Sequence, residues 1–213
     1  MKRLIAALAA LLFAAAAVAQ MPAFVQPRTR WVPPRPLPAT ARIRLDTSAG
    51  PIIILLDIRH APITATNFLR YVEEKRFDGT TFYRAARNPT NKTTGLVQGG
   101  IDHNMPRSWF PIGHEPTTKT GIKHVDGTIS MARNEPGTAM GDFFICVGPA
   151  QRLDAVPGSD VLVGYAAFGH VISGMDIVHR ILALPTWPGG RTKELVGQSI
   201  RKPVTIITAR RIG

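Results

Sequence analysis

Hydrophobic and polar residues alternate along most of the chain, and this pattern predicts a structure built mainly from strands. Residues 42–46 alternate charged with apolar side chains, as in a strand with one face in water. Residues 52–56 are continuously apolar, as in a more buried strand. Between them, residues 48–51 have the sequence Ser-Ala-Gly-Pro, which is turn chemistry. The two strands are therefore predicted to form a hairpin.

Further strands and two helices follow this hairpin. Apolar residues spaced as i, i+3, i+4 and i+7 predict a helix over residues 63–74, and Met175, Val178 and Leu182 mark a second helix that Pro185 ends. The other predicted strands are residues 81–84, 95–99, 128–132, 143–147, 165–171 and 203–209. Many strands with two helices favour a closed barrel capped at its ends, although the pattern alone does not separate a barrel from a sandwich.

The first 19 residues have the composition of a signal peptide. Two basic residues precede an apolar run over residues 4–18, and the small residues at its end predict cleavage before Gln20. The run is shorter than the ~20 residues that a membrane-spanning helix needs. We therefore expect a cleaved signal and a periplasmic or secreted protein. An uncleaved membrane anchor is the alternative.

A proline-rich segment separates this signal from the rest of the chain. Residues 22–38 contain six prolines and no acidic residue, so residues 20–40 are predicted to be an extended linker. The folded domain is predicted to span residues 41–213. If the signal were kept, the linker would space this domain from a membrane.

The chain is strongly basic, with a formal net charge of +12. Such a charge attracts nucleic acid, anionic lipid headgroups or acidic surfaces. No dense basic block with interleaved aromatic residues is present, so we expect no nucleic-acid partner, but weak association with an anionic envelope surface fits the charge. The one cysteine, Cys146, excludes a disulfide framework and any zinc site with two or more thiolates. It is predicted to be a small buried hydrophobe.

Common catalytic motifs are missing from the sequence. It has no glycine-rich phosphate loop, no paired-cysteine motif, no H-E-x-x-H and no G-x-S-x-G elbow. Its six histidines show no metal-ligand spacing. The sequence therefore does not support a hydrolase or a metalloenzyme.

Four short motifs do occur in a fixed order along the predicted domain. They are residues 82–84 (Phe-Tyr-Arg), 97–100 (Val-Gln-Gly-Gly), 127–132 (Gly-Thr-Ile-Ser-Met-Ala) with 142–145 (Asp-Phe-Phe-Ile), and 165–169 (Tyr-Ala-Ala-Phe-Gly) with 174–176 (Gly-Met-Asp). Together they resemble the cyclophilin family of peptidyl-prolyl cis-trans isomerases, closest to its bacterial exported branch, over residues 41–206.

This resemblance implies both a fold and an activity. The fold would be mainly β, a closed eight-stranded antiparallel barrel capped by two α-helices. The activity would be isomerisation of Xaa–Pro bonds without a cofactor or a metal. The partners would be unfolded or partly folded proteins that contain such bonds, and we expect a monomer.

The resemblance also assigns candidate site residues. Arg84 matches the family's catalytic arginine, Gln98 the glutamine that orients it, and Phe144 the floor of the proline pocket. Period-2 geometry places Phe82 on the strand face of Arg84, and Leu96 on that of Gln98. The remaining matches, which would contact substrate, are Ala132 and Arg133 along its backbone and Leu153 and Tyr165 in the far wall.

Several positions depart from the family pattern. Six extra residues lie within residues 85–94, and Gly95 stands where a pocket phenylalanine is expected. Tyr83 stands where histidine is common, and Arg133 where asparagine is usual. Arg152 stands where a tryptophan or phenylalanine usually closes the pocket. Some of these departures favour a rival hypothesis, a barrel that binds proline-containing segments with weak catalysis or none. A third hypothesis is an envelope-associated protein in which the fold is incidental.

Asp142 is the most consequential departure, because it replaces a glutamine and shares a strand face with Phe144. It is therefore also a candidate substrate contact. An uncompensated carboxylate at this place would be costly. We expect Asp142 to pair with Arg133 or Arg152, which leaves Arg84 free for substrate. If Asp142 held Arg84 instead, it would compete with the substrate.

Overall fold

The computed structural model describes residues 36–190 and 192–213. The predicted signal peptide, its cleavage site and most of the predicted linker lie outside the described residues. The first strand begins at Thr40, close to the predicted start of the folded domain.

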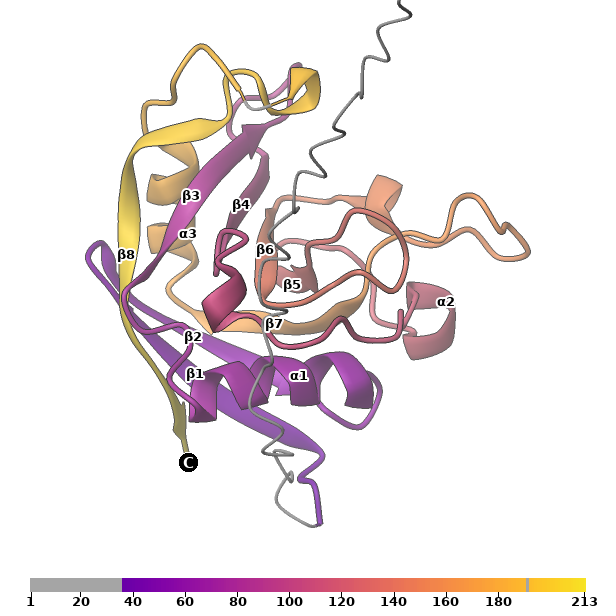
Figure 1. The fold of residues 1–213 in the computed structure, drawn as a ribbon. Coiled ribbons are helices and arrows are strands. Elements are labelled where there is room, and N and C mark those ends of the chain that lie inside the picture. Colours follow the sequence, from indigo (N-terminus) through magenta and orange to yellow (C-terminus); the bar gives the residue numbers. More distant parts are fainter. Residues whose placement is uncertain (1–35, 191) are drawn as a thin grey trace, which may run out of the picture. The chain divides into compact units, whose positions relative to one another are not determined.

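Eight antiparallel strands form a closed barrel, shown in Figure 1. They are β1 (Thr40–Thr47), β2 (Gly50–Asp57), β3 (Thr80–Arg87), β4 (Gly95–Gly100), β5 (Thr128–Met131), β6 (Asp142–Val147), β7 (Ala167–Ser173) and β8 (Ser199–Ile212). Around the barrel the order is β1-β2-β7-β5-β6-β4-β3-β8. The predicted fold class is confirmed, as is the hairpin of β1 and β2.

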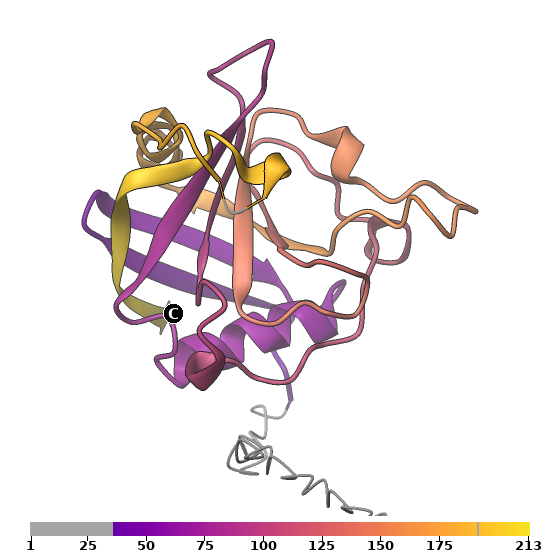
Figure 2. The same ribbon diagram turned by 45° about the horizontal axis from the view of Figure 1, so that its top comes forward.

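Two longer helices, α1 (Pro62–Glu73) and α3 (Met175–Ala183), cover the barrel, as predicted (Figures 1 and 2). A single turn, α2 (Thr117–Thr120), was not expected, because four residues carry no helical periodicity. Three short 3-10 turns are η1 (Met105–Arg107), η2 (Gln151–Leu153) and η3 (Lys193–Leu195). No helix within the described residues is long and apolar enough to cross a bilayer.

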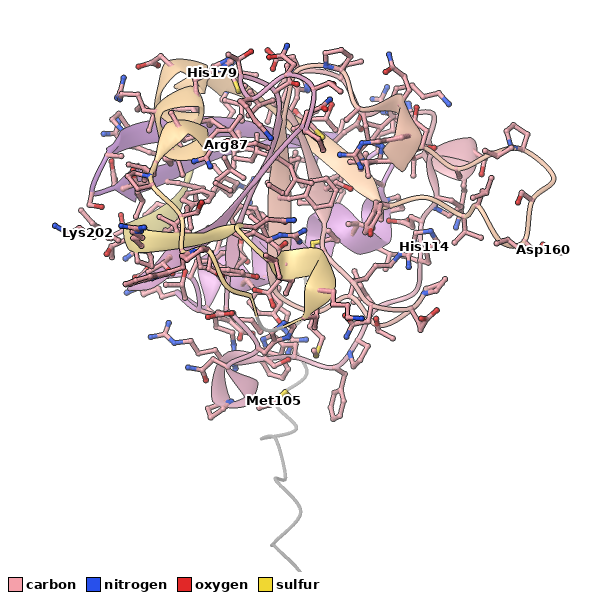
Figure 3. The ribbon with its side chains drawn as sticks, turned by 90° about the horizontal axis from the view of Figure 1, so that it is seen from above. Arg87, Met105, His114, Asp160, His179 and Lys202 are labelled. Atoms are coloured by element: carbon pink, nitrogen blue, oxygen red, sulfur yellow. The ribbon has the colours of Figure 1, made fainter. Side chains whose placement is uncertain are left out.

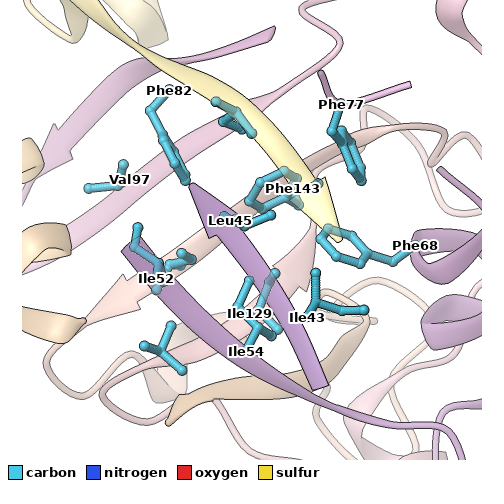
Figure 4. Close-up of a cluster of buried hydrophobic side chains, with 14 of the residues drawn as sticks. Ile43, Leu45, Ile52, Ile54, Phe68, Phe77, Phe82, Val97, Ile129 and Phe143 are labelled. Carbon is cyan, nitrogen blue, oxygen red and sulfur yellow. The ribbon is translucent and has the colours of Figure 1, made fainter. Parts of the chain in front are cut away.

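The barrel interior is filled with side chains and forms the main hydrophobic core. Charged and apolar residues alternate in β1, and its apolar residues Ile43 and Leu45 are completely buried. Figure 4 shows these residues with the aromatic rings beside them. Phe68 of α1 packs edge-on against Phe143 of β6, with ring centroids 5.2 Å apart. Because the interior is filled, a binding site must lie on the outside of the barrel.

The N-terminus of α1 is satisfied by a buried carboxylate from a distant loop. Glu115 accepts hydrogen bonds from the backbone N–H groups of Ile63 (3.2 Å) and Thr64 (2.7 Å) and from the Thr64 hydroxyl (2.7 Å). These N–H groups have no partner within the helix, and the helix dipole favours a negative charge there. Glu115 therefore fixes the long loop between β4 and β5 to the helix.

A β-bulge in β3 changes which face its side chains occupy. Phe82 pairs with Gly99 and Arg84 pairs with Gln98, so Tyr83 is the extra residue. Gly99 permits the close approach of the two strands, because a Cβ there would lie 2.8 Å from the Phe82 ring. Phe82 consequently lies in the barrel core, whereas Arg84 points outward. The prediction that Phe82 and Arg84 share a face is therefore wrong, because it assumed an unbroken period of two.

Strand β8 extends beyond both ends of the predicted strand because it pairs with β1 along one edge and with β3 along the other. Its pairing with β3 is interrupted between Ser199 and Val204. Pro203, which has no N–H to donate, lies within this interruption. The strand thus accommodates a proline at a position that has no paired residue on β3.

Candidate functional site

A pocket of about 780 Å³ lies on the outer surface of the barrel. It is built over a second, smaller apolar cluster that is separate from the main core, and that includes Leu96, Phe144, Cys146 and Leu153. The strand order β5-β6-β4-β3 places four neighbouring strands beneath it. The hairpin between β3 and β4, which projects beyond the barrel in Figure 2, adds Asn88, Pro89 and Thr90 to its rim.

Nine of the ten predicted site residues line this pocket. They are Arg84, Leu96, Gln98, Ala132, Arg133, Asp142, Phe144, Leu153 and Tyr165. Phe82 does not: it is completely buried and packs against Phe143 with ring centroids 5.7 Å apart. The expectation that Phe82 contacts substrate is corrected accordingly, for the reason that the bulge gives.

Phe144 forms the apolar floor of the pocket and is held from two sides. Tyr165 meets it edge-on, with ring centroids 5.4 Å apart and planes at 87°. The imidazole of His124 stacks against it at 6.1 Å, with planes at 16°. The two contacts fix the orientation of the Phe144 ring at the floor of the pocket.

Arg84 lies at the edge of this floor, and two glutamine side chains fix its guanidinium. Its Nε donates to Oε1 of Gln198 (2.8 Å), and its Nη1 donates to Oε1 of Gln98 (2.7 Å). Within the described residues, Nη2 has no hydrogen-bond partner, and no carboxylate lies within 4.0 Å of the guanidinium. Burial lowers the pKa of Arg84, but an arginine remains protonated at neutral pH. The charged Nη2 group, with its two N–H bonds, therefore remains available to a ligand.

The orientation of Gln98 is fixed in turn by a chain of hydrogen bonds. Gln98 Nε2 donates to the Tyr83 hydroxyl (2.7 Å), which donates to Oδ1 of Asp142 (3.1 Å). Because a carboxylate only accepts, the Tyr83 hydroxyl must donate to it and can accept from Gln98. The oxygen of the Gln98 amide is thereby turned toward Arg84. Burial, and then the charge of Asp142, raise the pKa of Tyr83, so the phenol keeps its proton.

Asp142 does not pair with any of the three arginines that were considered for it. Its carboxylate accepts the backbone N–H groups of Asp102 (2.8 Å) and His103 (3.4 Å) in addition to the Tyr83 hydroxyl. Asp102 and His103 have φ of 46° and 58°, a left-handed conformation that turns successive N–H groups toward one anion. Burial raises the pKa of Asp142, which these hydrogen bonds partly offset. The predicted pairing with Arg133 or Arg152, and the competition for Arg84, are both wrong, because backbone donors are invisible in a sequence.

Arg133 and Tyr165 form the far wall of the pocket. The guanidinium of Arg133 lies 4.8 Å above the Tyr165 ring and donates to the carbonyls of Gly164 (2.5 Å) and Asn134 (2.8 Å). Tyr165 N–H donates to the carbonyl of Leu153 (2.9 Å), which closes the base of the loop between them. Arg152, next to Leu153, also lines the pocket and is exposed.

The pocket includes residues that sequence reasoning missed. Gln198 is 114 positions from Arg84, and only the fold brings them together. Gly95, by contrast, is not a lost pocket residue: with φ of 148°, a Cβ there would lie 2.1 Å from the Ala86 carbonyl oxygen. No phenylalanine fits this backbone, which explains the glycine at this position.

A chain of serine, histidine and aspartate lies beneath the pocket. His124 contacts Oδ1 of Asp154 through Nδ1 (2.7 Å) and the Ser130 hydroxyl through Nε2 (3.0 Å). This is the connectivity of a hydrolase triad, but both Ser130 and His124 are completely buried, so no substrate can reach the hydroxyl. Among the described residues, no group of three or more His, Cys, Asp and Glu side chains could hold a metal ion.

The fold and the pocket together define a closed β-barrel protein with a pocket on its outer face, between an apolar floor and one fixed arginine. Comparison with known proteins gives this class a name. The model of the cyclophilin type peptidyl-prolyl cis-trans isomerases matches residues 42–210. The chain belongs to this family.

Curated relatives and solved structures agree with this membership. A peptidyl-prolyl cis-trans isomerase of Acinetobacter baylyi is 33% identical over 165 residues, which cover 76% of this chain and 83% of the relative. Peptidyl-prolyl cis-trans isomerase A of Dickeya dadantii is 32% identical over 175 residues, or 80% of this chain and 84% of the relative. A crystal structure of a Cryptosporidium parvum cyclophilin in the presence of the dipeptide Ala-Pro has the same fold, with a TM-score of 0.62 at 18% identity, over 81% of this chain and 99% of that one.

Proposed function

We propose that this isomerase accelerates rotation about Xaa–Pro bonds in unfolded or partly folded exported proteins, with Arg84 as the donor to the imide nitrogen. The observation that carries this proposal is the geometry of Arg84. Its guanidinium is fixed at the edge of the apolar floor by Gln98 and Gln198, with Nη2 left for a ligand.

The reaction explains why such a pocket needs neither a nucleophile nor an acid–base pair. Rotation about the peptide bond faces a barrier of ~20 kcal/mol, because the C–N bond is partly double. A hydrogen bond to the imide nitrogen localises its lone pair and removes resonance from that bond. The twisted amide offers this lone pair, whereas the planar amide does not. The donor therefore binds the transition state better than the ground state, which is the requirement for catalysis.

The floor, the arginine and the hydrogen-bonded groups around it have different roles in the proposed mechanism. The proline ring lies on Phe144 and Leu96, and Arg84 Nη2 faces the imide nitrogen. Gln98 and Gln198 hold the guanidinium, and the chain from Gln98 through Tyr83 to Asp142 keeps the Gln98 oxygen turned toward Arg84. Because these groups are already in place, little reorganisation is needed as the bond twists.

The size of the expected effect follows from the strength of one bond. A charge-assisted hydrogen bond contributes about 1.5–3 kcal/mol, which corresponds to a rate factor of about 10 to 100. Any further acceleration has to come from preferential binding of the twisted form by the rest of the pocket. Arg84 is thus expected to supply a large share of the acceleration but not all of it.

The test is a peptide isomerisation assay on the purified domain. The protein should accelerate cis-to-trans conversion of a short Ala-Pro peptide above its uncatalysed rate, and Arg84→Ala should lower kcat/KM about 10- to 100-fold. Arg180→Ala is a matched control, because it removes an exposed arginine on α3 that pairs with Asp176. If wild type and Arg84→Ala both leave the uncatalysed rate unchanged, the isomerase mechanism fails.

The same assay separates the isomerase from the binding-module hypothesis. Peptide binding without acceleration would select the binding module. Asp142 was the main ground for suspecting poor catalysis, and its carboxylate is engaged by Asp102, His103 and Tyr83 instead of Arg84. This arrangement favours the isomerase.

Export belongs to this proposal as well. The composition of residues 1–19 supports a cleaved signal and a periplasmic or secreted location, in keeping with the exported branch that the motifs resemble. Residues 20–40 would then be an extended linker before the domain. N-terminal sequencing of the protein expressed from its full gene in a bacterial host should find Gln20 as the first residue; an N-terminus at Met1 in the membrane fraction would instead indicate a retained anchor.

A further inference from the structure

The charges around the pocket are strongly unbalanced. Four arginines line it, namely Arg84, Arg87, Arg133 and Arg152, whereas Asp142 is the one acidic lining residue in the described part of the chain. Arg84 is held by the two glutamines, and Arg87 donates to the carbonyls of Leu182 and Leu184 at the end of α3. The other two arginines are Arg133, which donates to the carbonyls of Gly164 and Asn134, and the exposed Arg152.

The protein's own carboxylates do not neutralise these two arginines. Asp142 is already bound by two backbone amides and by Tyr83. Asp154 accepts from His124, and Asp160 lies at the tip of a loop that projects away from the barrel in Figure 3. Within the described residues, neither Arg133 nor Arg152 has a carboxylate within 4.0 Å.

Both arginines belong to the same wall of the pocket. Arg152 precedes Leu153 in η2, and Arg133 stacks on Tyr165, whose N–H is bonded to the Leu153 carbonyl. Arg133 follows β5, Phe144 lies in β6, and Arg84 lies in β3, with β4 between β6 and β3. The wall and Arg84 are therefore on opposite sides of the apolar floor. A proline seated on the floor would have its neighbouring residues within reach of the wall.

The Arg133 guanidinium is also held in place before any ligand binds. Two carbonyls and the Tyr165 ring fix it, so little conformational entropy is lost when an anion approaches. Arg152 is exposed and adds a second positive charge to the lining of the same pocket. Two positive charges in one pocket lining favour an anionic group over a neutral group of the same shape.

We propose that Arg133 and Arg152 form a subsite for the carboxylate of an Asp or Glu side chain within two residues of the substrate proline. The inference rests on the proposed function, because it places that proline on Phe144. It assigns this isomerase a preference for acidic segments around Xaa–Pro bonds. Both arginines are departures from the family pattern, in which asparagine is usual at one position and tryptophan or phenylalanine at the other.

The test compares peptides that differ only in charge. The peptides are based on one Ala-Pro sequence in which a single residue is replaced by either Glu or Gln. The replaced residue is the second before the proline, the alanine directly before it, or the first or second after it. Both kcat/KM and binding affinity are measured for every pair. At low salt we expect the Glu peptide to exceed the Gln peptide about 3- to 10-fold in kcat/KM and in affinity for at least one position. This ratio is the range expected for one or two partly exposed ion pairs. The ratio should approach one near 0.5 M salt, where the screening length is short.

Substitutions of Arg133 and Arg152 test whether these two residues cause the preference for Glu peptides. Arg152→Gln and Arg133→Asn should each reduce the ratio, which is measured within a single protein and so does not depend on its absolute activity. Arg42→Gln is the control for net charge, because it removes one positive charge from an exposed position on β1 outside the pocket. The control should keep the wild-type ratio.

Each outcome decides one of the two proposals. A ratio near one at all four positions, or a preference that both wall variants retain, overturns the subsite. If neutral peptides are still isomerised in that case, the proposed function stands. If no peptide is isomerised, the proposed function fails, and the affinity ratio of the same peptide pairs still decides the subsite.

Discussion

At the scale of single residues, the site depends on one chain of hydrogen bonds. Asp142 is anchored by two backbone amides, holds the Tyr83 hydroxyl, and through it fixes the Gln98 amide that holds Arg84. Two departures from the family pattern, Tyr83 and Asp142, thus belong to one arrangement. The anchor explains why a carboxylate is tolerated beside an apolar floor without an arginine partner.

Removing the Tyr83 hydroxyl should therefore slow the reaction without greatly weakening binding. In Tyr83→Phe the Gln98 amide is free to rotate, so the Arg84 guanidinium is less well fixed. We expect kcat to fall about 5- to 10-fold while KM changes less than about twofold, as for loss of roughly 1–1.5 kcal/mol of transition-state stabilisation. A change confined to KM in the peptide assay would place Tyr83 in substrate binding instead.

A second residue-scale prediction concerns Asp142 itself. The Asp142 carboxylate does not hold Arg84, but it accepts from the Tyr83 hydroxyl and so keeps Gln98 in place. Asp142→Gln should therefore lower kcat/KM, because this carboxylate is lost. A competition between Asp142 and substrate would have predicted a faster variant. A rate above that of wild type in the same assay would show that the carboxylate does restrain Arg84 in solution.

At the scale of elements, the sequence pattern was enough to place the strands and both longer helices of the described residues. The resemblance to the family was enough to select nine residues of one pocket. Periodicity could not predict the bulge at Tyr83, which places Phe82 in the core. It also could not predict the contact between Gln198 and Arg84, because these residues are brought together only by the closed barrel. The amides that bind Asp142 depend on the φ angles of Asp102 and His103, which no residue-type pattern reveals.

The carboxylate of Glu115 at the start of α1 gives a stability prediction at this scale. Glu115→Ala would leave the buried N–H group of Thr64 and the partly buried N–H group of Ile63 without this partner, so the free energy of unfolding should fall by about 2–3 kcal/mol. Urea unfolding measures this change. Glu135→Ala, at an exposed loop position, is the matched control and should stay within about 0.5 kcal/mol of wild type. Equal effects of the two substitutions would contradict the capping role.

The buried His124 gives the barrel a pH-dependent stability. Burial lowers its pKa below the usual 6.5, an effect that Asp154 partly offsets and Lys123 reinforces. The unfolded chain therefore binds more protons than the folded one below about pH 6.5, and this contribution to stability is lost as the pH falls further. Urea unfolding between pH 7.5 and 5.5 should show the loss, and His124→Phe should flatten it. Stability that rises on acidification would contradict a neutral His124.

At the scale of the whole molecule, two separate apolar clusters have different roles. The larger one fills the barrel and makes it rigid, while the smaller one lies outside β4 and β6 and supports the floor of the pocket. Cys146 belongs to the smaller cluster and is completely buried, as predicted, and burial raises the pKa of its thiol to about 12. The cysteine is thus a packing residue.

This burial predicts a chemically silent thiol in the folded protein. Because the thiolate is the reactive form, iodoacetamide should leave Cys146 unmodified in native buffer at pH 8 and alkylate it fully in urea. Mass spectrometry after a fixed exposure distinguishes the two states. Alkylation of the native protein at the rate of the unfolded chain would mean that the pocket floor opens readily.

The most direct test of the whole account is the substitution Arg84→Lys, measured by NMR exchange on an Ala-Pro peptide at equilibrium. Lysine keeps the positive charge but loses the planar fork that Gln98 and Gln198 hold, so its donor is no longer fixed toward the imide nitrogen. We predict a loss of at least about tenfold in the catalysed exchange rate, with peptide affinity nearly unchanged. Exchange at the wild-type rate in Arg84→Lys would contradict the claim that a positioned guanidinium drives the isomerisation.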